Sequence, residues 1–540
     1  MKQRITYVVH DPDDFNPSQL HLSPTNDSFT LDSVNAAKEH RLTFGLSELP
    51  QELYRVLRQC HELHIRWASE KPYASIPPYV SRISPGLHAF FTPHKGSPAY
   101  VDLLCPLLKK VFGDGLKCES PQDTFIGMPI LSERFSMSSA SQYYQLLPSL
   151  KDLVTYIQQK ICATSDPSCQ THAASLLSAT YVDIDYDTIS HALVLNVFWD
   201  RAPDAESWTE TIALCQKADH IEVGVLTSEK AVDPEDLAFS GFLTVIGKDS
   251  KPSPTRFSFP ARHHPLPSSA PPTPPLTYTT SFRQPTGLHP TLLLSFPSAS
   301  LTPPDETCAL HAYLTLPAAL FIDKYQLSDP LFLSSQHLTS LRSISGATDL
   351  EAPVWVVPEW GSAALLELAV PASPSSSNSD SDSASHSRSS SPPNPGPDDW
   401  TVRIPLHLRY LSPNANASGL APVAAPWPAV FWACRGEEGA KMAASPFDRV
   451  NLGYEGLFGP KTMFYHVPPA AANVSSEVGA RLVEEIRVPV LDLDQAWYVE
   501  WGTAVVVGLG TLWVFWKLFE IVRRDLVGGT KVEGEGKKAQ

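Results

Sequence analysis

A long uncharged stretch near the C-terminus limits what this chain can fold into more than any other feature of its sequence. No charged residue occurs from Trp501 to Trp516, and aromatic residues gather at both ends of this stretch. A helix crosses the ~30 Å hydrocarbon core of a bilayer with about 20 apolar residues, and aromatic rings settle at the two interfaces. Buried core helices, which are the alternative, rarely combine this length with all-round apolar character. We therefore predict one transmembrane helix over residues 497–522.

The charges on either side of this span predict its orientation. Six basic residues follow Trp516, whereas residues 481–500 contain two basic and five acidic residues. Lysine and arginine are enriched on the cytosolic side of membrane spans. We therefore expect residues 523–540 to form a cytosolic tail and the long N-terminal part to lie in the lumen.

The two ends of the sequence bear on where the protein resides. Lys537 and Lys538 resemble the dilysine retrieval signal of endoplasmic reticulum membrane proteins, although two solvated lysines are the simpler alternative. Near the N-terminus the apolar run from Ile5 to Val9 is too short for a secretory signal. We expect the C-terminal span itself to direct insertion into the endoplasmic reticulum membrane. A cytosolic protein anchored by its tail is the alternative.

Two further sets of residues follow from this topology. N-glycosylation sequons begin at Asn26, Asn416 and Asn473, and the predicted orientation makes all of them lumenal. Within the span, a stripe of small residues allows another helix to approach closely. The stripe consists of Ala504, Gly508 and Thr511.

Composition excludes several classes of function. The net charge of −16 argues against a nucleic-acid partner, because phosphate binding needs concentrated lysine and arginine. The eight cysteines include no C-x-x-C pair, so neither a zinc site nor a redox motif is expected, and no cofactor is predicted. In an oxidising lumen some cysteines could pair, but the sequence does not give the pairing.

The first 250 residues predict a lumenal domain of mixed α and β structure. Ser47 is placed to cap a helix that opens near Pro50, and residues 150–161 have helical spacing of apolar residues. Between them, Leu63, Ile65 and Trp67 alternate with polar residues, which is a strand pattern. Further strands are expected at Ala192 to Trp199, Ile221 to Thr227 and Phe242 to Ile246.

Residues 251–276 are rich in proline and are interpreted as a linker that holds neither a ladder nor a helix. Residues 277–490 then predict a second, β-rich lumenal domain, an antiparallel sandwich, with a disordered Ser/Pro insertion at 371–399. Its strands are expected at Thr291 to Phe296, Ala309 to Leu316, Val354 to Val357, Leu365 to Val370, Val402 to Leu411, Ala429 to Ala433 and Thr462 to Val467.

Most catalytic motifs fail on spacing. The run from His61 to His64 lacks one residue of a His-Glu-x-x-His zinc motif, and residues 241–249 do not match a phosphate loop. Two acidic clusters have the Asp-x-Asp spacing with which many glycosyltransferases hold a metal ion. They are Asp183, Asp185 and Asp187, and Asp492 with Asp494. A lumenal glycosyltransferase or hydrolase that uses these clusters is therefore the alternative function.

Longer stretches of the sequence resemble the fungal relatives of PIG-X, the accessory subunit of glycosylphosphatidylinositol (GPI) mannosyltransferase I. In the first region these stretches are Cys60 to Glu70 and Ser84 to Pro93. In the second region they are Gly287 to Pro290, Leu316 to Leu327, Asp349 to Leu368 and Ile404 to Leu411.

This resemblance implies a single-span protein with a lumenal body that stabilises the catalytic mannosyltransferase subunit, which adds the first mannose to the anchor precursor. It also implies a role in the folding of other lumenal proteins, and it brings no catalytic residue. Strand edges or an apolar face of the body would cover lumenal loops of the partner, because binding only the folded form stabilises it by mass action.

Overall fold

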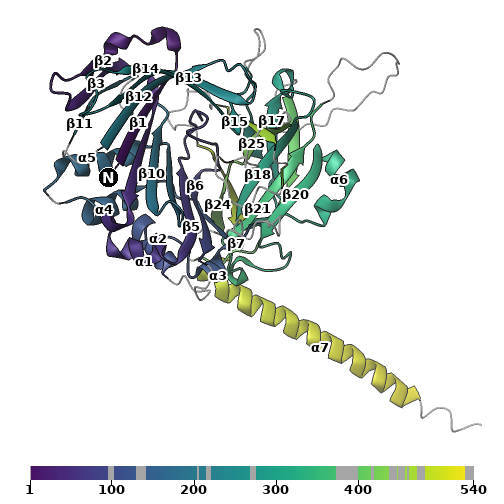
Figure 1. Ribbon diagram of the computed structural model, residues 1–540. Coiled ribbons are helices and arrows are strands. Elements are labelled where there is room, and N and C mark those ends of the chain that lie inside the picture. The colour runs from purple at the N-terminus through teal and green to yellow at the C-terminus, as the bar shows by residue number, and fades with distance from the viewer. Residues whose placement is uncertain are drawn as a thin grey trace, which may run out of the picture. The chain divides into compact units, whose positions relative to one another are not determined.

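The computed structural model describes residues 2–94, 103–128, 141–163, 165–203, 206–214, 220–267, 275–371, 399–414, 419–436, 447, 457–458, 461–470 and 481–528. The chain divides into two compact units, one of Met1–Arg409 with Ala424–Ile486 and one of Tyr410–Val423 with Arg487–Gln540. β-Structure dominates the first unit, and a single long helix dominates the second (Figure 1).

An eleven-stranded sheet forms the N-terminal half of the first unit. Its order is β14-β13-β12-β1-β4-β10-β9-β5-β6-β8-β7, and β1 pairs in parallel with β12 while the other neighbours pair antiparallel. The strands are β1 Lys2–Val9, β4 Ala36–Gly45, β5 Cys60–Ala68, β6 Gly86–Pro93, β7 Ile126–Gly127, β8 Ser141–Gln145, β9 Tyr181–Asp187, β10 Ala192–Trp199, β12 His220–Glu229, β13 Asp236–Val245 and β14 Ser253–Pro260. A smaller sheet contains β11 Trp208–Ala213, β3 Ser28–Val34 and β2 Leu20–Leu22.

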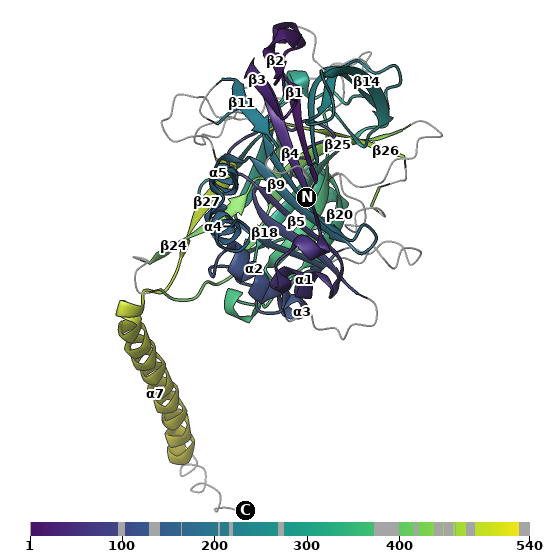
Figure 2. The ribbon, with the colours of Figure 1, turned by 60° about the vertical axis from the view of Figure 1, so that its left-hand side comes forward.

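One face of the large sheet is apolar and is covered by helices. Successive side chains of a strand point to opposite faces, so Leu63, Ile65 and Trp67 of β5 enter the core on one side. Helices α1 Gln51–Leu57, α2 Leu104–Phe112 and α4 Lys151–Lys160 pack beside one another, and all three add apolar side chains to this core (Figure 2). The opposite face of the sheet carries both polar residues and a smaller apolar cluster around Val8, Leu226 and Phe239.

The predicted helices and strands of this region are confirmed, with one exception in detail. The helix at 150–161 is α4, and the three strands expected between 192 and 246 are β10, β12 and β13. Helix α1 does begin after Pro50, but Pro50 itself occupies the N-cap, and Ser47 lies in a preceding 3-10 turn. The expected cap by Ser47 is therefore wrong. The region also contains α3 Pro121–Thr124 and α5 Pro167–Ser175.

The C-terminal half of the first unit is mostly β, as predicted. A six-stranded sheet has the order β15-β26-β25-β18-β21-β20 and is mixed, because β15 pairs in parallel with β26. The strands are β15 His263–His264, β18 Ala309–Pro317, β20 Leu338–Gly346, β21 Gly361–Leu368, β25 Ala429–Arg435 and β26 Thr462–His466. Smaller sheets contain β16 Thr279–Phe282 with β17 Thr291–Pro297 and β22 Asp399–Pro405, β19 Leu320–Phe321 with β23 His407–Leu408, and β24 Leu420–Pro426 with β27 Val483–Pro489. The sandwich arrangement itself stays a prediction.

Two expectations for the second half of the chain are wrong. The run Val354–Val356 is a 3-10 turn, not a strand, because prolines flank it closely on both sides. The proline-rich stretch at 251–276 does take part in a ladder, since β14 pairs with β13 along its whole length. This strand lies at the edge of the sheet, where a missing N–H does not interrupt pairing.

The two halves of the first unit also share one core. Apolar residues from both sides of 251–276 belong to a single buried cluster. At the junction, the Tyr313 hydroxyl lies 3.2 Å from Oε1 of Gln142, and the Trp360 indole donates to the Gln142 backbone oxygen at 2.8 Å. The stretch at 251–276 therefore does not separate two independent cores, and most of the predicted insertion at 371–399 lies outside the described residues.

Three disulfides connect cysteines whose pairing the sequence left open. They are Cys105–Cys118, Cys162–Cys169 and Cys308–Cys434. Cys60 is buried with its thiol free, and burial raises the pKa of that thiol to about 12, so it is inert at neutral pH.

The second unit contains the predicted span. Helix α7 extends over Ala496–Gly528, and residues 493–524 form the one candidate membrane span of the described residues, with a mean hydropathy of 1.8 in its most apolar window. A span of this kind fits a single-pass membrane protein. Near its end, Lys517 and Arg524 both pair with Glu520, at 2.9 Å and 2.6 Å.

Candidate functional site

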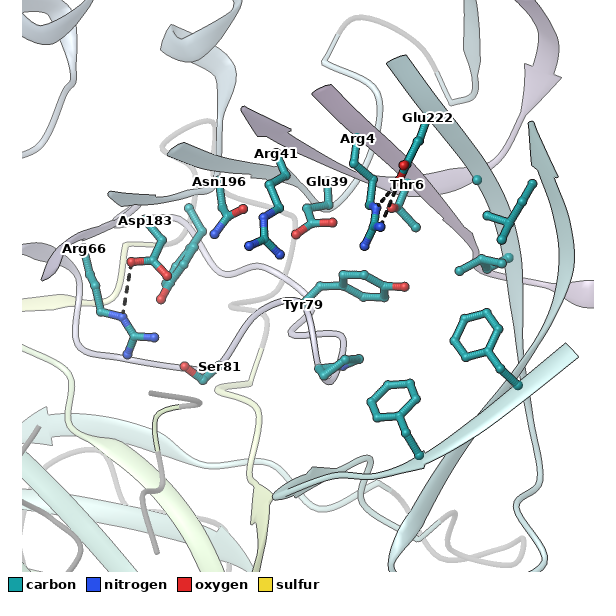
Figure 3. Close-up of a pocket in the computed structure, with 17 residues that line it drawn as sticks. Arg4, Thr6, Glu39, Arg41, Arg66, Tyr79, Ser81, Asp183, Asn196 and Glu222 are labelled. Atoms are coloured by element: carbon teal, nitrogen blue, oxygen red, sulfur yellow. Dashed lines mark hydrogen bonds and ion pairs between the residues drawn. The ribbon is translucent and has the colours of Figure 1, made fainter. Parts of the chain in front are cut away.

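The first acidic cluster lies on β9 and faces basic side chains of β5. Asp183 and Asp185 point to the polar face of the sheet, where Arg66 and His64 are their register partners (Figure 3 shows Arg66 and Asp183). Nδ1 of His64 is 2.7 Å from Oδ1 of Asp185, and Nε of Arg66 is 3.7 Å from Oδ1 of Asp183. A divalent cation needs carboxylate oxygens that converge on it, whereas these two carboxylates each oppose a different basic residue.

Asp187 of the first cluster and Asp492 of the second stabilise turns. Asp187 accepts hydrogen bonds from the backbone of Ile189 and Ser190 at 2.7 Å, directly after β9. Asp492 caps a 3-10 turn, η9 Leu493–Gln495, by accepting from the Asp494 backbone N–H at 3.0 Å. These are the ordinary structural uses of aspartate at turns, and they give no support to a catalytic role.

The other candidate residues lie apart from one another. Asn26 is half-buried in the turn between β2 and β3, with a φ of 59°. The sequon asparagines Asn416 and Asn473 and the tail residues Lys537 and Lys538 fall outside the described residues.

The small-residue stripe lies on α7. Nothing in the structure touches the position of a side chain at Gly508, and the Thr511 hydroxyl donates to the Val507 carbonyl within its own helix at 2.8 Å. Close packing of Ala504, Gly508 and Thr511 against another helix stays a prediction.

A different group of residues is brought together by the fold. The four stretches of the second region that carry the family resemblance converge on β23. His407 of this strand pairs with Phe321 of β19 in the ladder and stacks on its ring, with centroids 5.2 Å apart. The Nδ1 atoms of His407 and His289 are 3.0 Å apart. Burial, and then the neighbouring His289, lower the pKa of His407, so one imidazole can accept from the other at neutral pH.

Arg409, two residues further along, ties the fourth stretch to the second and the third. Its guanidinium donates to the backbone oxygens of Ala352 and Ala347 at 2.8 Å and 3.2 Å, and it also donates to that of Asp349. The cation lies 4.2 Å above the Phe321 ring. Arg409 is only 3% exposed, so its planar fork fixes the loop 347–352 against β19 from the inside.

Large apolar side chains project outward from these same segments. Trp355 is 59% exposed and Val356 61%, and both follow directly after the loop that Arg409 holds. The others are Leu288, Tyr325 and Leu350. We call these five residues the apolar surface. Exposed tryptophan followed directly by an exposed valine is uncommon on a protein that acts alone, and exposed apolar residues on segments held together from within are typical of a surface that contacts another molecule.

Sequence reasoning named the stretches that form this site but not its residues. Arg409 stands in a predicted strand that is mostly apolar, and a cation that is buried there needs acceptors. That signal was present in the sequence. The sequence does not identify the acceptors, because backbone oxygens some 60 residues away contact the Arg409 guanidinium only after folding.

Comparison with known proteins places this site in context. The sequence profile described as PIG-X / PBN1 matches residues 285–519, which include all residues of the apolar surface. "Protein pbn1" of Emericella nidulans is 50% identical over 556 aligned positions, which cover 100% of this chain and 99% of that protein. "Protein pbn1" of Neurospora crassa is 41% identical, with 97% and 96% covered. The shorter match to "Protein pbn1" of Schizosaccharomyces pombe is 27% identical and covers 46% and 62%.

Proposed function

Because this chain belongs to the PIG-X / PBN1 family, we propose that it is the non-catalytic subunit that stabilises the catalytic subunit of GPI mannosyltransferase I. Membership of the family supports an accessory role in GPI-anchor biosynthesis. The specific partner, and a wider role in the folding of other endoplasmic reticulum proteins, are part of the proposal.

The observation that carries the proposal is the apolar surface. It lies inside the segment that matches the family profile, and its segments are fixed from within by Arg409 and His407. A rigid surface loses little conformational entropy when it binds, so exposed aromatic and aliphatic side chains on it bind more tightly than the same side chains on a mobile loop. Lumenal loops of the catalytic subunit are the proposed ligand.

Binding of this kind stabilises the partner without any chemistry. A subunit that binds only the folded form of the partner shifts the folding equilibrium by mass action, by about 2.7 kcal/mol when its concentration is about 100 times Kd. The proposed result is a catalytic subunit that is degraded when the accessory subunit is absent.

Trp355→Asp combined with Val356→Asp tests the surface. Both side chains are more than half exposed, so the variant should fold, while charge placed in a desolvated contact should cost about 2 kcal/mol or more. We expect recovery of the catalytic subunit in detergent co-purification to fall at least about tenfold.

Val232→Asp is the matched control, because Val232 is 97% exposed and lies in a turn of the N-terminal half. It should leave recovery unchanged. Equal recovery with the double variant and with this control would remove the apolar surface from the proposal.

We also propose that the first unit is lumenal and the tail cytosolic, as the flanking charges predict. The three disulfides support this orientation, since disulfides persist in the oxidising lumen and are rare in the cytosol. In intact microsomes we expect protease to spare the first unit and to remove only a tag placed after residue 540. Digestion of the first unit before detergent is added would contradict the orientation.

A further inference from the structure

The polar face of the eleven-stranded sheet borders a cavity of about 420 Å³. Cavities that bind small molecules have volumes of about 300–1,000 Å³. All of its lining residues lie between residues 4 and 259, so the cavity is outside the segment that matches the family profile and apart from the apolar surface. The proposed stabilising role does not account for it, and Asp183 is the one residue of the predicted acidic clusters that lines it.

One wall of the cavity is a transverse row of polar side chains. Six strands that are neighbours in the sheet, in the order β5, β9, β10, β4, β1 and β12, each contribute one residue. These residues are paired in register, so their side chains follow one another across the sheet (Figure 3). In order along the row they are Arg66, Asp183, Asn196, Arg41, Arg4 and Glu222. An unbroken polar row on a sheet face that also carries apolar residues is costly unless its groups are hydrogen-bonded.

The charges of the cavity balance. Its lining contains three guanidinium groups and three carboxylates, the sixth charge being that of Glu39. Arg4 pairs with Glu222 at 2.9 Å, and Arg66 faces Asp183. A ligand with a strong net charge would therefore meet opposing charges of both signs, whereas a neutral ligand with many polar groups would not.

Several polar groups of the lining can form further hydrogen bonds with such a ligand. Ser81 is only 2% exposed, and its hydroxyl has no hydrogen-bond partner within the described residues. The same holds for the buried side-chain oxygen of Asn196. The Arg41 guanidinium forms no ion pair in the part of the chain that the structure describes, although it has five N–H donors. Buried polar atoms such as those of Ser81 and Asn196 are rare unless a ligand or water satisfies them, whereas the Arg41 side chain is exposed and therefore accessible to a ligand.

The opposite wall is aromatic. Phe257 and Phe259 of β14 line the cavity with rings nearly parallel at an interplanar angle of 18°. Tyr79 lines the cavity as well and packs edge-on against Phe239, and burial raises the pKa of its phenol, which stays a hydrogen-bond donor at neutral pH. Flat apolar rings facing a row of mixed donors and acceptors suit a ligand that is apolar on one face and polar around its edge.

We propose that this cavity binds a neutral oligosaccharide. A sugar ring presents C–H groups on its faces, which pack on aromatic rings, and hydroxyl groups around its edge, each of which both donates and accepts hydrogen bonds. Arg41 and Tyr79 donate to the sugar hydroxyls, and the Asn196 side-chain oxygen accepts from them. Binding involves no covalent step.

Binding of fluorescein-labelled pentasaccharides to the full-length chain in detergent tests this site. Neutral pentasaccharides of mannose, glucose and N-acetylglucosamine are compared with a phosphorylated mannose pentasaccharide by fluorescence polarisation. We expect at least one neutral pentasaccharide to bind, and the phosphorylated one to bind more weakly. No binding of any neutral probe at millimolar concentrations, or a preference for the phosphorylated probe, would overturn the proposal.

Two variants locate the binding. Arg41→Gln should weaken it at least about tenfold, because charged donors form the strongest hydrogen bonds of such a site. Tyr79→Phe removes only the phenol hydroxyl and should weaken it several-fold. Arg403→Gln is the control, since Arg403 is exposed on β22 and outside the cavity, and it should bind as wild type. If Arg41→Gln binds the pentasaccharide as tightly as this control does, the assignment of the cavity as the binding site fails, whatever the affinity of Tyr79→Phe.

The source of the sugar is distinguished by competition. The same oligosaccharide is added unlabelled in free form, attached to a glycoprotein, and attached to a lipid in vesicles. Stronger competition by the glycoprotein assigns the site to glycoprotein clients, and stronger competition by the lipid assigns it to a glycolipid headgroup. Because the readout is sugar binding, its failure leaves the recovery of the catalytic subunit unaffected, and the two proposals fail separately.

Discussion

Arg409→Ala is expected to release the loop 347–352 and to lower both the stability of the chain and the recovery of the catalytic subunit. The substitution leaves the backbone oxygens of Ala347, Asp349 and Ala352 without their donor. It also removes a cation from the Phe321 ring. Unsatisfied acceptors cost about 1–3 kcal/mol each when buried, and these carbonyls are partly open to water. We expect the free energy of unfolding to fall by about 3 kcal/mol in total.

Two further variants separate the effect of the guanidinium geometry on stability from the effect of its charge. Arg409→Lys keeps the charge but offers a compact ammonium group with three rotatable donors in place of a planar fork, so it should recover less than half of the lost stability. Arg403→Ala, at an exposed position of β22, should be nearly neutral. Urea denaturation in detergent measures the stabilities. Wild-type stability of Arg409→Lys would show that the charge alone matters and that the fork geometry does not.

Cys308→Ser is expected to destabilise the first unit more than any other loss of a disulfide. Cys308 and Cys434 are 126 residues apart in sequence, whereas Cys162 and Cys169 are separated by 7. A cross-link restricts the unfolded chain more strongly when it closes a longer loop, which gives about 5 kcal/mol for the first bond and about 2 kcal/mol for the second. The lost bond also connects the beginning of β18 to the end of β25, two neighbouring strands of the six-stranded sheet.

Thermal unfolding of Cys308→Ser and Cys162→Ser, each with its partner cysteine also replaced, measures the difference. The protein lacking Cys308–Cys434 should melt well below the protein lacking Cys162–Cys169. Equal melting temperatures would mean that the unfolded chain is already compact in this region, so that the long loop carries little entropy.

The sequence predicted best what depends on neighbouring residues. Alternation in Leu63, Ile65 and Trp67 gave β5 and the face that it buries, and the charge-free stretch gave α7. Prediction from the sequence failed where the position of a strand in the sheet decides whether proline is tolerated. Pro254 and Pro260 argued against a strand, yet β14 tolerates them because it is the outermost strand.

The candidate site was predictable only in part for the same reason. The stretches around His289, Phe321 and His407 could be named from the sequence, but their convergence depends on pairing between β19 and β23. The polar row of the cavity is a clearer case. Its residues come from six strands and show no local motif, because each strand contributes a single residue.

The central place of β1 has a consequence for biogenesis. This strand, at Lys2–Val9, pairs in parallel with β12, so that Arg4 meets Glu222 at a separation of 218 residues. Contacts of such long range form late. Strand β4 can pair with one edge of β1 soon after synthesis, but the other backbone edge of β1 stays open until β12 has been synthesised. A nascent chain of this design needs protection by chaperones before it can close its own sheet.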